Sequence, residues 1–302
     1  MTTQASGLGS VYERGYRRWD GKLRARTLRF LPVATEGVRL LLKPRGSVLR
    51  NLLQYGLYGI ALVPFLAFAV LIYLQKSLEI AALLGAKFDA SKAEFYPSFF
   101  QIELGFVLLF SLVTGSGLIA NDMRRNALEI YFSRPLKLHD YLAGKLLVIG
   151  FFLASITLFP ALLLWLIDYL LTSEPGYLVR VAPQLVGVIV FSTILIGVHA
   201  LTVLAVSSLT RRGWVAAVIW VSFMLASEFT GHALAEAFDS KRWLLVSPAN
   251  AAMNWCRCLF SYTPPGGETA GAGESALALV GYLVVGAVIL YLRVRAVHVV
   301  KD

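Results

Sequence analysis

Long uncharged hydrophobic runs alternate along this chain with short polar segments. A helix needs about 17–25 residues to cross the hydrocarbon core of a bilayer, and several runs reach or approach that length. We predict six transmembrane helices, at about residues 51–75, 104–121, 146–167, 183–208, 214–235 and 275–292. Pro64 predicts a kink in the first of them. The fold class expected is an all-α integral membrane protein.

Two of the runs carry additional information about packing. Residues 181–210 hold no charge and are longer than one straight crossing needs, so this span is expected to tilt or to begin with an interfacial piece before Pro183. The second span ends in Gly115-Ser116-Gly117, small residues that allow a neighbouring helix to approach closely. The loop after the third span is expected to hold Asp168, Glu174 and Arg180.

A charged interruption at residues 114–145 separates the second and third spans. Asn121 or Asp122 can cap a short helix in it, and Arg125 can pair with Glu129 one turn later. Apolar residues at helical spacing give this helix one buried face: Met123, Ala127, Ile130 and Tyr131. The turn that follows contains a proline, which ends the helix: Ser133, Arg134 and Pro135. We predict one surface helix over about residues 122–134.

The same segment resembles a motif of a known family. It reads Gly117-Leu-Ile-Ala-x-Asp122-x-Arg124-Arg125-x-Ala-Leu-Glu129, then Ser133-Arg134-Pro135-Leu, then Tyr141-x-x-Gly144-Lys145-Leu. This pattern resembles the segment between the second and third spans of ABC-2-type transporter permeases. One departure is Asn126, where many members of that family have a glycine.

The resemblance implies a type V exporter-like architecture and a coupling helix that docks on a cytosolic ATPase subunit. Two ATPase copies would bind ATP and Mg, this chain would hold no cofactor of its own, and a second permease copy would complete a homodimer. The bacterial cytoplasmic membrane is the location implied. The coupling surface would comprise Asp122, Met123, Arg124, Arg125, Glu129, Ile130, Tyr131, Ser133, Arg134 and Pro135.

Composition agrees with membrane insertion, since 57% of the 302 residues are hydrophobic, only 15% are charged, and the mean hydropathy is +0.68. Residues 1–50 are basic, and their apolar residues recur at helical spacing, which predicts an amphipathic helix in the headgroup region in contact with membrane lipid. Pro32 and Pro44 are expected to bend and end this helix. A disordered basic arm is the alternative.

Charge also predicts the topology. Placing both termini, the central segment and the Arg211-Arg212 turn on one side collects 21 of the 28 lysine and arginine residues there and leaves 7 opposite. The positive-inside rule makes that side cytoplasmic, so residues 236–274 are expected to be extracytoplasmic. Topology therefore explains the net charge of +10 without nucleic acid as a partner.

Residues that could carry chemistry are few. The phosphate-binding pattern GxxxxGK[ST] is not found in the sequence, so we expect a permease without its own ATPase site rather than an enzyme. His199 lies in an apolar span, where a histidine bonded to a neighbouring helix is the simpler interpretation. His199, Glu228 and His232 are candidates for a substrate path. Cys256 and Cys258 are too few ligands to predict a metal site.

The function expected is thus the permease subunit of an ABC exporter. The first alternative is a secondary transporter or channel, which requires ionisable residues deep within several spans. The second is a membrane enzyme that acts on lipids, which requires a convergent metal or acid–base cluster. The hydrophobic spans do not specify a substrate.

Overall fold

The computed structural model of this chain describes residues 29–43, 48–77, 90, 92–132, 136–264 and 270–299. Every regular element in these ranges is helical. Six helical stretches are long and apolar enough to cross a membrane, in agreement with the six predicted spans: Tyr55–Lys76, Phe95–Arg124, Leu138–Leu170, Tyr177–Leu209, Gly213–Ala237 and Ala272–Ala296. The chain is a multi-pass, all-helical membrane protein.

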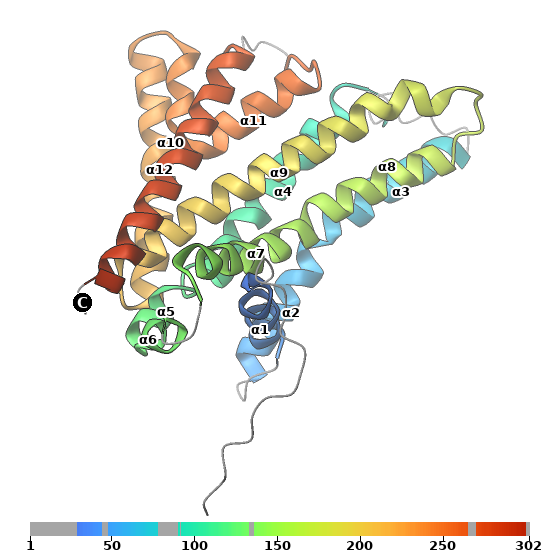
Figure 1. The fold of residues 1–302 in the computed structure, drawn as a ribbon. Helices are drawn as coiled ribbons and strands as arrows, with labels where there is room; N and C mark the ends of the chain where they lie inside the picture. The colour runs from blue at the N-terminus through green and yellow to red at the C-terminus, as the bar shows by residue number, and fades with distance from the viewer. Residues whose placement is uncertain are drawn as a thin grey trace, which may run out of the picture.

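Individual helices subdivide these spans (Figure 1). The short helices α5 and α6 lie at one end of the bundle and α11 lies at the other; we call these the α5–α6 end and the α11 end. The elements of the described residues are α1 (Phe30–Leu42), α2 (Val48–Ala61), α3 (Val63–Ser77), α4 (Phe95–Phe110), the π-helical turn η3 (Ser111–Gly115), α5 (Ala120–Arg124), α6 (Ala127–Phe132), α7 (Leu138–Ile156), α8 (Leu158–Leu170), α9 (Tyr177–Leu209), α10 (Gly213–Ala237), the 3₁₀ helix η4 (Lys241–Val246), α11 (Pro248–Leu259) and α12 (Ala272–Val299).

Two spans are broken close to a proline. The first span is interrupted at Leu62, between α2 and α3, two residues before Pro64, where the sequence predicts a kink. The third breaks at Thr157, between α7 and α8, three residues before Pro160. A proline lacks the N–H that would bond the carbonyl four residues earlier, and its ring crowds that carbonyl. The break at Thr157 was not predicted.

The second and fourth spans differ from their predicted bounds. The second begins at Phe95 rather than at Leu104, because an aromatic cluster extends the helix by packing Phe95 and Phe99 against Phe68 of α3. Glu103 consequently lies inside the span. The fourth span is one continuous helix of 33 residues that includes Pro183, so no separate interfacial piece precedes that proline. At about 1.5 Å per residue it exceeds a bilayer core of about 30 Å, which requires tilting or protrusion.

Small residues bring α9 against the end of the second span, as predicted. A Cβ atom added at Gly115 would lie 2.6 Å from side-chain atoms of both Ile149 and Val203. In the turn that follows, the Ser207 hydroxyl donates to the carbonyl of Ser116 at 2.7 Å and accepts from the amide of Ala120 at 3.1 Å. A side chain of α9 thus satisfies backbone groups that the irregular helix leaves unpaired.

Helix α1 lies along α7, and its described part agrees with the predicted amphipathic helix. Glycines allow the close contact, because a Cβ added at Gly144 would lie 2.7 Å from Val33 and one at Gly37 would lie 2.5 Å from Val148. Pro32 stands in the first turn, where no helical donor is lost, so it does not bend α1. The helix ends at Leu42. Residues 1–28 and Pro44 lie outside the described residues.

The predicted single helix over residues 122–134 is wrong in the described part of the segment, which forms α5 and α6 instead. Asn126 separates them with a φ of 51°, in the left-handed region. Asn121 and Asp122 do not cap a helix, because both lie within α5. Asparagine and glycine adopt the left-handed conformation more readily than other residues, which explains how Asn126 occupies a position where the resembling family often has glycine.

Substitution of Asn126 tests this backbone geometry. Asn126→Val should lower the free energy of unfolding by about 1–3 kcal/mol, because a β-branched residue is strained at positive φ. Asn126→Gly should leave stability close to that of the unsubstituted protein. Thermal unfolding of both variants in the same detergent measures the difference, and equal stability of the two would contradict a left-handed Asn126.

The segment between the fifth and sixth spans contains the 3₁₀ helix η4 and the α-helix α11. Helix α10 continues past Glu228 to Ala237, as predicted. Pro248 then opens α11, and the Ser247 hydroxyl caps it by accepting from the amide of Asn250 at 3.3 Å. Helix α11 lies at the end of the bundle away from α5 and α6 (Figure 1).

Candidate functional site

The α5–α6 surface is charged outside and apolar beneath. The side chains of Arg124, Arg125 and Glu129 are exposed, as their predicted role requires. Leu128 is buried, although the sequence did not single it out, since the break at Asn126 changes the register of the apolar face. Met123 and Tyr131 are partly buried and pack on the core, as expected. The side chain of Ile130 and all of Ser133, Arg134 and Pro135 lie outside the described residues.

Asp122 points toward α7 and forms what we call the α5–α7 clamp with Tyr141 and Lys145. The Lys145 ammonium lies 2.6 Å from Asp122 Oδ2, and the Tyr141 hydroxyl donates to the same oxygen at 2.9 Å. The Lys145 side chain is 8% exposed and that of Asp122 is 19% exposed. The ring of Tyr131 packs on Tyr141, and burial, followed by the nearby Asp122 carboxylate, raises the pKa of Tyr131. The clamp joins both short helices to α7.

The α5–α6 surface therefore has two direct attachments to long spans. The α5–α7 clamp ties it to α7, and the hydrogen bonds of Ser207 tie the start of α5 to α9. Both attachments use buried or largely buried polar groups, where a hydrogen bond is costly to break. A displacement of α5 would consequently act on both helices.

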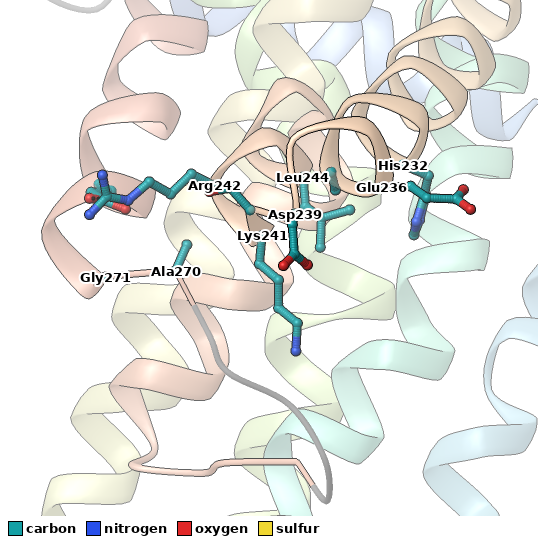
Figure 2. A pocket seen from close by; sticks show the side chains of 11 residues that line it. His232, Glu236, Asp239, Lys241, Arg242, Leu244, Ala270 and Gly271 are labelled. Atoms are coloured by element: carbon teal, nitrogen blue, oxygen red, sulfur yellow. Dashed lines mark ion pairs between the residues drawn. The ribbon is translucent and has the colours of Figure 1, made fainter.

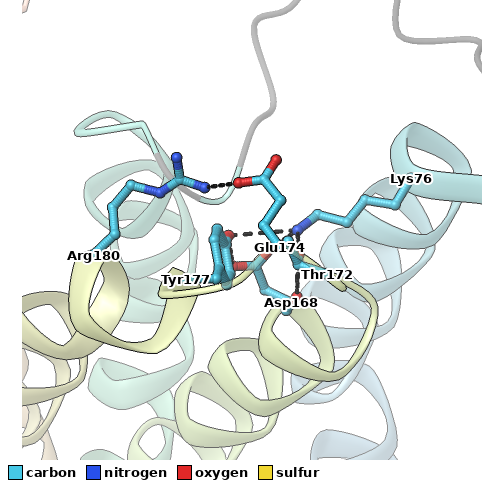
Figure 3. A network of polar contacts seen from close by, with 6 residues as sticks. All are labelled: Lys76, Asp168, Thr172, Glu174, Tyr177 and Arg180. Carbon is cyan, nitrogen blue, oxygen red and sulfur yellow. Dashed lines mark hydrogen bonds and ion pairs between the residues drawn. The ribbon is translucent and has the colours of Figure 1, made fainter.

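A second clamp lies at the α11 end and joins α3, α8 and α9 (Figure 3). The Lys76 ammonium lies 2.5 Å from Asp168 Oδ1, and the Tyr177 hydroxyl donates to Asp168 Oδ2 at 2.5 Å. Lys76 also contacts the Thr172 hydroxyl. Asp168 was expected in a loop, but it lies in α8 with a side chain only 2% exposed, where Lys76 balances its charge and Tyr177 donates to it. Glu174 and Arg180 form an exposed ion pair nearby.

A polar cavity of about 640 Å³ opens between α10, η4 and the start of α12 (Figure 2). Arg242 and Glu274 form an ion pair of 3.1 Å on one side of it. Both acidic and basic side chains reach the cavity. It can therefore contact a polar or zwitterionic molecule, and it does not favour purely anionic or purely cationic molecules. Its ionisable lining is His232, Glu236, Asp239, Lys241, Arg242 and Glu274.

Two of the three predicted path residues, Glu228 and His232, lie together, whereas His199 has a different partner. Glu228 accepts from the Ser247 hydroxyl at 2.6 Å and from the Asn250 amide at 2.9 Å, so it fastens α10 to the start of α11. His232 lies 3.2 Å from Glu228 and lines the polar cavity. His199 is fully buried in α9, and its Nδ1 contacts the carbonyl of Leu195 in its own helix rather than in a neighbouring one. Their role in a path remains a prediction.

Among the described residues, no group of three His, Cys, Asp or Glu side chains has the arrangement of a metal site. Cys256 is fully buried, and burial raises the pKa of its thiol well above the usual value. A protonated thiol is a poor metal ligand and a poor nucleophile. The Cys258 thiol donates to the carbonyl oxygen of Ala270, with 3.7 Å between Sγ and that oxygen.

Glu103 is the functional candidate that the sequence prediction missed. The predicted second span begins at residue 104 and so leaves Glu103 outside it, but Glu103 lies within α4 and is 0% exposed. The aromatic residues on its N-terminal side were the available signal, because they extend the apolar face of the helix outward. Comparison of the chain with protein families and with curated proteins gives no match. Interpretation of the site therefore depends on its geometry.

Proposed function

We propose that this chain is the permease subunit of an ATP-driven ABC transporter, and that it works as an exporter. The observation that carries the proposal is the α5–α6 surface, which exposes Arg124, Arg125 and Glu129 while the α5–α7 clamp and Ser207 fasten it to two long spans. A docking surface must be accessible on one side and firmly attached on the other to transmit a force. This surface meets both requirements.

The proposed mechanism is mechanical. Two cytosolic ATPase subunits bind ATP and Mg, and their closure pushes on α5 and α6 of a homodimer of this chain. The push reaches α7 through Asp122 and Lys145, and it reaches α9 through Ser207. The break at Thr157 and the π-helical turn η3 are positions where these spans can bend, since a helix bends where its regular bonding is interrupted. In this topology the α5–α6 end faces the cytoplasm.

The polar cavity supports an exit for cargo at the α11 end. It lies at the opposite end of α10 from Gly213, and His232 from the predicted path lines it. Glu228 acts beside this exit by holding α10 to α11. An exporter would release its substrate there after the spans reopen.

A paired substitution tests the docking surface. Arg125→Ala with Glu129→Ala should abolish stoichiometric copurification of an ATPase with a Walker A motif, because the exposed charged contacts are removed. The matched control is Glu174→Ala with Arg180→Ala, which removes an exposed ion pair at the α11 end and should leave copurification unchanged. Affinity purification in mild detergent followed by mass spectrometry measures the partner. An equal ATPase yield from both double variants would contradict the proposed docking surface.

Glu103 favours a second candidate, a secondary transporter without an ATPase. Secondary transporters place ionisable side chains deep in their spans, and Glu103 is such a side chain. Reconstituted vesicles separate the two functions: transport without ATPase subunits, driven by an ion gradient alone, would establish the second candidate and exclude the first.

A further inference from the structure

Glu103 places an acidic side chain inside a transmembrane span, and no ion pair or hydrogen bond among the described residues compensates the charge of that side chain. Its relative exposure is 0%, and within the described part of the chain neither carboxyl oxygen has a hydrogen-bond partner. It stands eight residues into α4, which is about 12 Å from the start of that helix. Burying an ionisable side chain at such depth costs free energy, and such a residue is by default a candidate for a functional site.

The face of α4 that carries Glu103 is fixed by aromatic contacts on either side. Phe99, one turn before it, packs on Phe68 of α3 with ring centroids 5.5 Å apart. Phe110, two turns after it, packs on Tyr58 of α2 with centroids 4.6 Å apart. Residues 99, 103 and 110 share one helical face, so Glu103 faces the stretch between Tyr58 and Phe68. The break between α2 and α3 at Leu62 lies in that stretch.

The second helix break lies at a similar height. Tyr58 contacts Phe152 of α7, with ring centroids 6.0 Å apart, and Lys76 is paired with Asp168 of α8. These two contacts align the first and third spans in parallel, which places the break at Thr157 close to the level of Leu62. Pro160 also leaves the carbonyl of Ile156, a fully buried residue, without its helical donor. Glu103 therefore lies at the level where two neighbouring spans are interrupted.

No described cation is available to neutralise Glu103. Lys76 and Lys145 belong to the two clamps, and Arg257 of α11 donates to Gln101 at 3.2 Å. The ion pairs found in the described residues do not include Glu103. The elements packed against α4 carry further titratable groups, of which Arg180 is paired with Glu174. The others are Tyr73 of α3, His139, Asp140 and Tyr141 of α7, Tyr177 and His199 of α9, and Cys256 and Cys258 of α11; Tyr96 lies on α4 itself and Tyr58 on α2.

These observations indicate which cation neutralises the carboxylate of Glu103. An isolated carboxylate in an apolar interior costs many kcal/mol, so the group is neutralised by a bound cation or by a proton. Within the described part of the chain, no group of three His, Cys, Asp or Glu side chains that could hold a metal ion includes Glu103, so a proton is the cation that this apolar environment favours. We propose that Glu103 is a proton-binding site within the membrane. In this conformation Glu103 holds its proton, and it releases the proton to water when the neighbouring spans separate at Leu62 and Thr157.

The proposal makes the conformational equilibrium depend on pH. The closed conformation carries one proton more at Glu103 than a conformation in which water reaches the carboxylate. Acidic pH therefore favours the closed conformation, and alkaline pH favours the open one. This link deepens the proposed transport function, but it does not depend on whether ATP or an ion gradient supplies the energy.

Dicyclohexylcarbodiimide provides a direct probe, because this apolar reagent adds to protonated carboxyl groups within membranes. Native membranes containing the full chain should give a covalent adduct at Glu103, with severalfold more adduct at mildly acidic than at alkaline pH. Glu174, whose side chain is 64% exposed, is the internal control and should remain unmodified. Peptide mass spectrometry measures both sites and requires neither a substrate nor an ATPase.

The variant Glu103→Gln supplies an independent readout. It keeps the shape of the protonated acid, so it should unfold at the same or a higher temperature, and the pH dependence of unfolding should become flatter. An adduct that forms at Glu103 equally at mildly acidic and at alkaline pH would overturn the proposal. A Glu103→Gln variant that is destabilised and keeps the original pH dependence would also overturn it. Loss of ATPase copurification, in contrast, bears only on the proposed function.

Discussion

Replacing Lys76 with methionine is expected to lower the free energy of unfolding by about 3–5 kcal/mol, because it leaves the buried Asp168 carboxylate without its cation. The Asp168 side chain is 2% exposed, so water cannot replace the ammonium group at 2.5 Å. The Tyr177 hydroxyl would remain as a donor but carries no charge. The unfolding transition of the detergent-solubilised protein measures the loss.

Two further variants test whether the unpaired buried charge causes the loss of stability in Lys76→Met. Lys76→Met with Asp168→Asn removes both charges and keeps an acceptor for Tyr177, so most of the lost stability should return. Arg180→Ala removes one member of the exposed ion pair with Glu174 and should cost about 0–1 kcal/mol. A Lys76→Met variant no less stable than Arg180→Ala would contradict a structural role for this clamp.

Transmembrane spans are the part of this fold that the sequence predicts best. Uncharged runs of bilayer length mark a helix whatever its neighbours are, and all six predicted spans correspond to long apolar helices. Local signals also suffice where one residue type has a strong effect. Pro64 predicted a kink in its span, and Gly115-Ser116-Gly117 predicted the close approach of another helix.

Contacts between distant segments explain what the sequence did not predict. Lys76 and Asp168 each resemble ordinary loop residues until α3, α8 and α9 are brought together, since each ion needs the other to be buried. Glu103 likewise marks the end of an apolar run in sequence, and only the aromatic contacts of Phe99 with Phe68 show that the helix continues around it.

In the candidate site, too, some features follow from the local sequence and others depend on contacts between distant segments. Exposed Arg124, Arg125 and Glu129 follow from charge and spacing alone. The inward orientation of Asp122 does not follow from charge and spacing, because it depends on Lys145, more than twenty residues later. The division into α5 and α6 does not follow from them either, because it requires positive φ at Asn126. Propensity favoured one continuous helix, and tertiary contacts with α7 and α9 override it.

The α5–α7 clamp gives the second large effect that we expect. Asp122→Asn removes the charge that balances Lys145, whose side chain is only 8% exposed, and should lower the free energy of unfolding by about 3 kcal/mol. Asp122→Asn with Lys145→Met removes both charges and should recover most of this stability. Under the proposed function, a complex of the double variant with its ATPase subunits should nevertheless hydrolyse ATP without moving substrate, because the charged link from α5 to α7 is lost.

A charge reversal distinguishes a mechanical link from general stabilisation. Asp122→Lys with Lys145→Asp restores an ion pair between the same two positions and should recover both stability and coupling of ATP hydrolysis to transport. Unfolding temperature and the ratio of ATP hydrolysed to substrate moved are measured on the same preparations. If the neutral double variant couples as well as the reversed pair does, the clamp stabilises the fold but transmits no force, and the attachment of α5 to α9 through Ser207 must carry the coupling alone.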